Sequence, residues 1–170
     1  MTLFEIRQII QKSELNRPNC RTATRQFLGT LASDYTVALT LTLNQKWFDK
    51  CGLMRVEHYL KEEDIPYIYA RFQHQLNKLI WKNRYTRFGE SVKMLRAWED
   101  KHGTKRKHLH AALGNFPSNF KLNTLPLLVE KASQQCFEID YQHKEDICDS
   151  GWIEYITKEV DKDNTDKILW

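Results

Sequence analysis

The segment from Tyr35 to Asn44 alternates strictly between large apolar side chains and small or polar ones. Val37 and three leucines occupy its odd-numbered positions, whereas Ala38, two threonines and Asn44 occupy the even-numbered ones. Because successive side chains of a β-strand point to opposite faces, this segment is predicted to be a strand with one face in a hydrophobic core. The chain must therefore build a sheet that has one buried face.

The rest of the chain favours an α+β fold. Apolar residues spaced by three and four positions predict helices over residues 3–13, 64–82, 123–136 and 151–162. Period-two patterns predict strands over residues 91–99, 107–113 and 137–142, with one more near 27–31, and the polar segment 14–25 is predicted to be loop or extended. We expect a central antiparallel sheet of about five strands flanked by helices. One domain is expected over residues 1–170, with residues 1–30 as a helical or extended N-terminal extension.

Composition limits the classes of protein to consider. The 170 residues are 41% hydrophobic and 28% charged, which is typical of a globular domain. A net charge of +4 permits a nucleic-acid partner without requiring one. The four cysteines form no CxxC pair, which disfavours a zinc knuckle or a disulfide framework. The chain shows neither a signal peptide at its start nor ~18 consecutive apolar residues, so we expect a soluble, cytoplasmic protein.

Two histidines in one predicted strand form a candidate metal site. Side chains at positions i and i+2 share a strand face, so His108 and His110 project together while Leu109 points into the core. If Trp98 pairs with Leu109 in a hairpin, Glu99 lies opposite His108, with the two Cβ atoms ~4.5–5.5 Å apart. Two imidazoles and a carboxylate suit a hydrated Mn²⁺ or Mg²⁺. The alternative is that the two histidines have only a structural role.

Tyr155 is a candidate nucleophile on the last predicted helix. It lies off the apolar stripe of that helix, with Lys158 and Glu159 three and four positions further on, beside it on the helix surface. A tyrosine phenol is a weak nucleophile at neutral pH unless nearby positive charge assists it. The alternative is an interfacial tyrosine whose hydroxyl caps a backbone group.

Taken in order, ALTLTLN (38–44), HLH (108–110) and YITK (155–158) resemble the three motifs of the Rep branch of the HUH endonucleases. These are single-tyrosine initiators of rolling-circle replication in plasmids and phages. The resemblance implies an RRM- or ferredoxin-like antiparallel sheet with the histidine strand at its centre. It also implies metal ligation by His108, His110 and Glu99, with Glu159 as a further acid near the metal.

The same resemblance implies the reaction. Tyr155 would attack a phosphate of single-stranded DNA and leave a 5′-phosphotyrosine bond and a free 3′-hydroxyl, which can prime synthesis or later rejoin the strand. Lys158 would steady the phosphate or the phenolate. The DNA would be an origin-like hairpin or nick site. The chain has no GxxxxGK[ST] motif, so a host helicase and polymerase would be partners.

Basic residues near the hairpin and between aromatic residues are expected to hold the DNA backbone. The predicted DNA-binding residues are Lys101, Lys105, Arg106, Lys107, Arg84 and Arg87, together with Thr40 and Thr42 on the first motif strand. The segment 81–88, which carries the two arginines Arg84 and Arg87, interleaves aromatic and basic residues, a composition suited to stacking on single strands.

Two other functions remain open. Single-tyrosine transposases of small insertion sequences share the motif order but usually carry glutamine where this chain has Lys158. A non-catalytic RRM-like module that binds RNA or DNA would present exposed aromatic residues on its central strands. The corresponding positions here hold Thr40, Thr42, His108 and His110.

Overall fold

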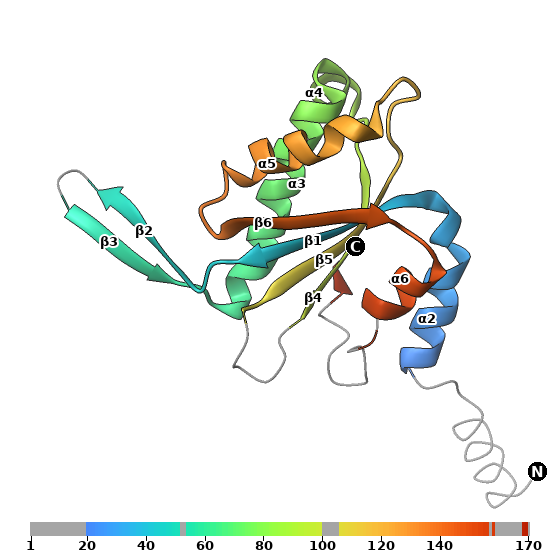
Figure 1. Cartoon of the computed structure of the whole chain (residues 1–170), viewed down its shortest axis with the longest axis horizontal. Coiled ribbons are helices and arrows are strands. Elements are labelled where there is room, and N and C mark those ends of the chain that lie inside the picture. The colour runs from blue at the N-terminus through green and yellow to red at the C-terminus, as the bar shows by residue number, and fades with distance from the viewer. Residues whose placement is uncertain (1–19, 52–53, 100–105, 157, 159–167, 170) are drawn as a thin grey trace, which may run out of the picture.

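A five-stranded antiparallel sheet lies at the centre of the computed structural model, which describes residues 20–51, 54–99, 106–156, 158 and 168–169 (Figure 1). The strands are β1 (Tyr35–Leu43), β4 (Lys93–Glu99), β5 (His108–Gly114), β6 (Ile139–Ile147) and β7 (Ile168–Leu169). Their order is β6-β1-β5-β4-β7, and every neighbouring pair is antiparallel. The histidine-bearing strand β5 is therefore central, as expected.

Two helices link these strands into a split β-α-β arrangement. Helix α3 (Ile65–Trp81) connects β1 to β4, and α5 (Leu125–Ser133) connects β5 to β6. The order β1-α3-β4-β5-α5-β6 is that of the ferredoxin-like motif, and it confirms an α+β fold. Each helix has a proline in its first turn, where the missing N–H leaves no hydrogen bond unmade. No helix in the described ranges is both long and apolar enough to cross a membrane.

Helices α3 and α5 cover one face of the sheet and form the main core with it. The alternation of β1 and β5 directs their leucines to this face, where Leu39, Leu41, Leu109 and Leu113 pack against Phe72 of α3. All five side chains are almost fully buried. The expected burial of one strand face is thus confirmed, and the threonines and histidines of these strands lie on the other face.

The second face is covered by α2 (Cys20–Thr30) and α6 (Ser150–Ile156) (Figure 1). A smaller core lies here, in which Leu28 of α2 meets Ala112 of β5 and two isoleucines of α6. We expected loop or extended chain over residues 14–25 and a strand near 27–31. Both expectations are wrong for the described residues, because residues 20–30 form the helix α2. The helix was missed because its residues are mostly polar, and among its described side chains only Leu28 is fully buried.

Other elements also differ from expectation. A two-stranded hairpin of β2 (Lys46–Cys51) and β3 (Met54–Tyr59) extends away from the main sheet, and a short helix α4 (Asn83–Phe88) follows α3 (Figure 1). Strand β6 begins two residues later than predicted and continues to Ile147, and Phe137, which precedes it, is 62% exposed. The predicted helix 3–13 and the last residues of the predicted helix 151–162 lie outside the described residues.

Tyr69 of α3 supports the centre of the sheet from the main-core side. Its fully buried hydroxyl donates to the carbonyl oxygen of Ala97 at 2.6 Å and lies 3.4 Å from that of His110. Tyr69→Phe is expected to lower the free energy of unfolding by about 1–3 kcal/mol, because the Ala97 carbonyl loses a buried donor. Denaturant unfolding measures this loss. Tyr67→Phe, at a 77% exposed position of the same helix, is the matched control and should change stability little.

Candidate active site

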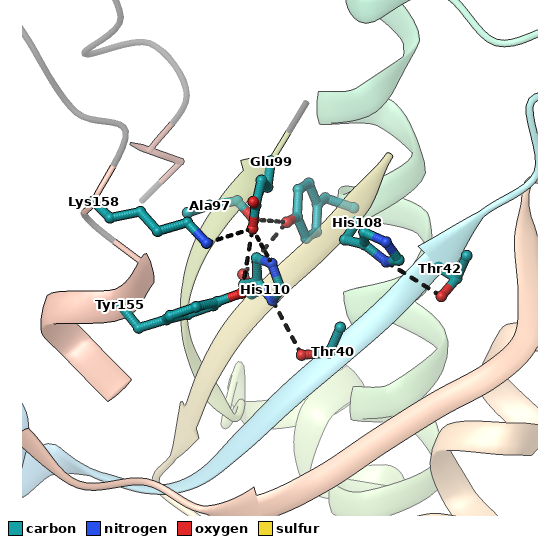
Figure 2. Close-up of polar contacts among 9 residues, drawn as sticks. Thr40, Thr42, Ala97, Glu99, His108, His110, Tyr155 and Lys158 are labelled. Atoms are coloured by element: carbon teal, nitrogen blue, oxygen red, sulfur yellow. Dashed lines mark hydrogen bonds and ion pairs between the residues drawn. The ribbon is translucent and has the colours of Figure 1, made fainter. Parts of the chain in front are cut away.

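The hairpin of β4 and β5 has the predicted register. Trp98 pairs with Leu109, and Glu99 pairs with His108. On the other side of β5, Thr40 of β1 lies opposite His110 and Thr42 lies opposite His108. Since directly opposed side chains share a face, three adjacent strands present two threonines, two histidines and one glutamate together. Figure 2 shows this group on the sheet face that α6 covers.

The two threonines set the orientation of the histidine rings. Thr40 Oγ1 lies 3.0 Å from Nδ1 of His110, and Thr42 Oγ1 lies 3.3 Å from Nδ1 of His108 (Figure 2). When Nδ1–H donates to the threonine oxygen, the lone pair of each ring is on Nε2, on the side away from β1. A hydrogen bond of this kind commonly fixes the tautomer of a metal-binding histidine. Sequence reasoning assigned these threonines to DNA contacts and missed their contact with the rings.

Glu99 contacts three other residues of the site through one carboxylate oxygen. Its Oε2 atom accepts from Lys158 Nζ at 2.7 Å and from the Tyr155 hydroxyl at 3.3 Å, and it lies 3.2 Å from Nε2 of His110 (Figure 2). The carboxylate is only 8% exposed. The Lys158 ammonium also lies 3.7 Å from the centre of the Tyr155 ring. One buried oxygen thus joins the histidine strand to the tyrosine and lysine of the last motif.

The charges of the group follow from burial and from these contacts. Burial alone would raise the pKa of Glu99, but the hydrogen bond and charge of Lys158, and then those of His110, lower it to about 2. Burial lowers the pKa of His110 to about 4, against the raising influence of Glu99. The pKa of Lys158 is raised: burial lowers it, but the contacts with Glu99 and Tyr155 outweigh burial. At neutral pH the group holds a carboxylate, a neutral His110 and an ammonium.

These charges predict how the metal-free protein responds to acid. The folded pKa of His110 lies below its unfolded value of 6.5, so the unfolded chain takes up this proton first. The contribution of His110 to stability is complete above about pH 6.5 and is lost as the pH falls toward about 4. Urea unfolding in EDTA across this range should show that loss, and His110→Gln should reduce its slope. An unchanged slope in His110→Gln would contradict the assignment.

Tyr155 belongs to an aromatic wall of the site. Its ring stacks on Trp152, with centroids 5.3 Å apart and an interplanar angle of 17°. The His110 ring stands edge-on to both, with centroid distances of 5.2 and 5.6 Å. The indole N–H of Trp152 donates to the carbonyl of Ala111 at 3.1 Å, while Ile153 and Ile156 anchor α6 in the smaller core. Tyr155 itself stays 41% exposed.

A pocket of about 430 Å³ opens over this group. Its lining residues are Thr40, Glu99, Arg106, His108, His110, Lys144, Trp152 and Tyr155. Sequence reasoning missed Trp152 and Lys144. The spacing of three residues between Trp152 and Tyr155, which places both on one side of a helix, was an available signal. Lys144 depends on the pairing of β6 with β1, which puts it opposite Thr40, and no local pattern reveals that pairing.

The residues present fit a divalent cation by their chemistry. No three His, Cys, Asp or Glu side chains in the described ranges already stand in an arrangement that could hold a metal ion. The His108 and His110 rings are nevertheless side by side, with centroids 6.2 Å apart. His110 Nε2 lies 3.2 Å from the Glu99 carboxylate: in one tautomer the ring N–H donates to it, and in the other the lone pair faces it and needs a cation beside it. The ammonium of Lys158 supplies that positive charge in this structure.

The other predicted residues are distributed over the molecule. Arg106 lines the pocket and pairs with Asp140 of β6. Lys107 instead contacts Glu62 at 2.9 Å and lies over the Trp98 ring on the main-core side. Arg84 and Arg87 are on α4, which comes before β4 in the chain. Glu99 is at the other end of β4, and the strand from Lys93 to Glu99 is about 20 Å long. Lys101, Lys105 and Glu159 lie outside the described residues.

His143 of β6 does not join the group. It pairs with Leu41 in the β1–β6 register, on the opposite face from Thr40, and contacts Glu145 at 3.2 Å.

No protein-family model matches the chain, and neither a curated protein nor a solved structure matches it.

Proposed function

We propose that the protein is a metal-dependent endonuclease that nicks single-stranded DNA and becomes covalently attached to it through Tyr155. The observation that carries this proposal is the contact of the Tyr155 hydroxyl with Glu99, which also contacts His110 and Lys158, beneath an open pocket. A buried cluster with only a structural role would not need its tyrosine half-exposed at the mouth of that pocket.

His108, His110 and Glu99 would hold Mn²⁺ or Mg²⁺, and a bound divalent ion supplies positive charge to an oxygen of the scissile phosphate. Thr40 and Thr42 keep both Nε2 atoms directed away from β1. Because the His110 ring stays neutral down to about pH 4, its lone pair is available throughout the physiological range.

The step itself uses one bond made and one bond broken. The phenolic oxygen of Tyr155 forms a bond to phosphorus as the P–O3′ bond breaks. The proton lost by the phenol is balanced by one taken up at the 3′ oxygen, which leaves as a hydroxyl. Lys158, whose ammonium lies over the Tyr155 ring, stabilises the negative charge that develops on the phenolic oxygen. In the reverse direction the 3′-hydroxyl attacks the phosphotyrosine and restores the strand.

Initiation of rolling-circle replication inside a cell, on a plasmid or phage, is the biological role that this chemistry fits best. A host helicase would unwind the DNA and a host polymerase would extend the 3′ end. Lys158 favours this role over a transposase because it occupies the position where transposases usually carry glutamine. The site face of β1 and β5 also carries threonine and histidine in place of the stacking aromatics of an RRM-like module.

The test is covalent capture. The full chain is incubated with circular single-stranded DNA and with a randomised oligonucleotide library, in the presence of Mn²⁺. A protein–DNA adduct that survives detergent is expected, as is a nicked 3′ end that a polymerase extends. Mass spectrometry should place the nucleotide on Tyr155, and EDTA or His108→Ala should prevent the adduct. DNA binding without any adduct would favour the non-catalytic module and overturn the proposal.

A further inference from the structure

A second cavity adjoins the active-site pocket, and Tyr155 lines both. It has a volume of about 500 Å³ and shares Thr40, Lys144, Trp152 and Tyr155 with that pocket. Two pockets that share four lining residues adjoin each other, and the stacked rings of Trp152 and Tyr155 line both. The second cavity alone falls in the size range of small-ligand sites. Any DNA strand that delivers a phosphate to Tyr155 must place a neighbouring nucleotide near it.

The aromatic wall offers this nucleotide a stacking surface. Trp152 lines both cavities, and its indole is held in place by the hydrogen bond to Ala111 and by the Tyr155 ring. A fixed indole can stack with any unpaired base, because every base has a π face. The hydrogen bond to Ala111 anchors α6, but no step of the proposed nicking chemistry uses the indole ring itself.

The lining of the second cavity also carries charge of both signs. Lys144 is exposed on the edge strand β6, and its ammonium is 3.6 Å from Asp146, a loose surface pair that a phosphate can replace. Asp149 also lines the cavity, and its Oδ1 is fixed by the backbone N–H of Trp152 at 2.8 Å. Carboxylates accept hydrogen bonds from the amino groups of cytosine, adenine and guanine, whereas thymine carries no amino group.

We propose that this second cavity is a subsite for one unpaired base next to the scissile phosphate, a proposal that rests on the nicking function above. Trp152 stacks on the base, and Lys144 contacts a backbone phosphate. Asp146 and Asp149 favour a base with an amino group over thymine. The subsite gives the protein a sequence preference at one nucleotide, separate from whatever else positions the DNA.

Binding to modified oligonucleotides tests the subsite. The nick site is first mapped with the wild-type protein, and all binding variants then carry Tyr155→Phe so that no covalent bond forms. Fluorescence anisotropy measures the affinity for oligonucleotides with an abasic site, or with each base in turn, at every position around the nick. One position adjacent to the scissile phosphate should lose about tenfold in affinity when abasic, and thymine there should bind more weakly than cytosine or adenine.

The protein variants identify the residues responsible. Trp152→Ala should bind the intact and abasic oligonucleotides equally, whereas Trp152→Phe should retain part of the difference. Trp47→Ala removes a tryptophan of the β2–β3 hairpin and serves as the matched control, with the abasic penalty unchanged. Asp146→Asn should reduce the discrimination against thymine. Lys144→Ala should weaken binding to all sequences and lower the salt dependence by about one phosphate contact.

Two outcomes would overturn the subsite. One is the absence of an abasic-sensitive position beside the nick. The other is an abasic penalty that stays the same in Trp152→Ala and Trp152→Phe, each checked for folding by circular dichroism. In either case an adduct on Tyr155 would leave the nicking function standing. Absence of the adduct with wild-type protein is a separate result and would remove the nicking function itself.

Discussion

Tyr155→Phe is expected to eliminate the protein–DNA adduct and to reduce nicking by at least ~10³-fold. The substitution removes one oxygen and keeps the ring, so the stack on Trp152 and the edge contact with His110 remain. Glu99 loses its contact with the Tyr155 hydroxyl, at 3.3 Å, but keeps those with Lys158 and His110. Stability and Mn²⁺ affinity should therefore change little, and the loss should be confined to chemistry.

Denaturing gels with end-labelled DNA measure the adduct, and calorimetric titration with Mn²⁺ measures the metal affinity. Tyr67→Phe is a suitable control, since Tyr67 is a 77% exposed tyrosine on α3, across the sheet from the site. An adduct formed in normal yield by Tyr155→Phe would move the nucleophile to another residue.

Glu99→Gln is expected to weaken Mn²⁺ binding by at least about tenfold and to reduce nicking with it. Glutamine has nearly the same shape, so the change is one of charge. The ionised state of Glu99, with its pKa lowered to about 2, pairs with Lys158 and would attract a divalent ion under the proposed function. The neutral amide provides neither interaction, and it leaves the Lys158 ammonium without its carboxylate partner.

Glu138→Gln is the matched control for this substitution. Glu138 is also 8% exposed and also pairs with a cation, Arg71 of α3, but it lies in a cavity with Tyr67 on the other side of the sheet. Losing this pair should lower stability and leave Mn²⁺ affinity unchanged. Equal effects of the two substitutions on Mn²⁺ binding would show that Glu99 acts through the fold and not as a ligand.

The sheet could be predicted from the sequence because its signals are local. Alternation marks β1, and the pairing of two large apolar residues, Trp98 and Leu109, fixed the hairpin register that puts Glu99 opposite His108. A slip of one residue would have turned Glu99 into the main core. Tyr155 could likewise be placed off the apolar stripe of its helix from spacing alone.

The contacts that assemble the site could not be predicted in this way. Lys158 reaches Glu99 across a sequence separation of 59 residues, and Thr40 reaches His110 across 70. Such pairs depend on which strands become neighbours, and composition does not encode that. Lys107 is the opposite case. It lies beside the histidines in the sequence and was predicted to contact DNA, but strand alternation and the contact with Glu62 direct it to the other face of the sheet.

The candidate metal ligands lie on the sheet and the candidate nucleophile lies on α6, and this separation affects how the site can move and evolve. The candidate ion-holding groups sit on β4 and β5, inside the hydrogen-bonded ladder, whereas Tyr155 sits on a helix of seven residues that rests on the sheet through two isoleucines and one indole. Local opening of a short, lightly anchored helix requires far less free energy than opening a central strand. Under the proposed function, evolution could therefore alter or discard the attacking group while the candidate ion-holding surface stays intact. A bound strand end could likewise move away with α6 while that surface stays in place for the next phosphate.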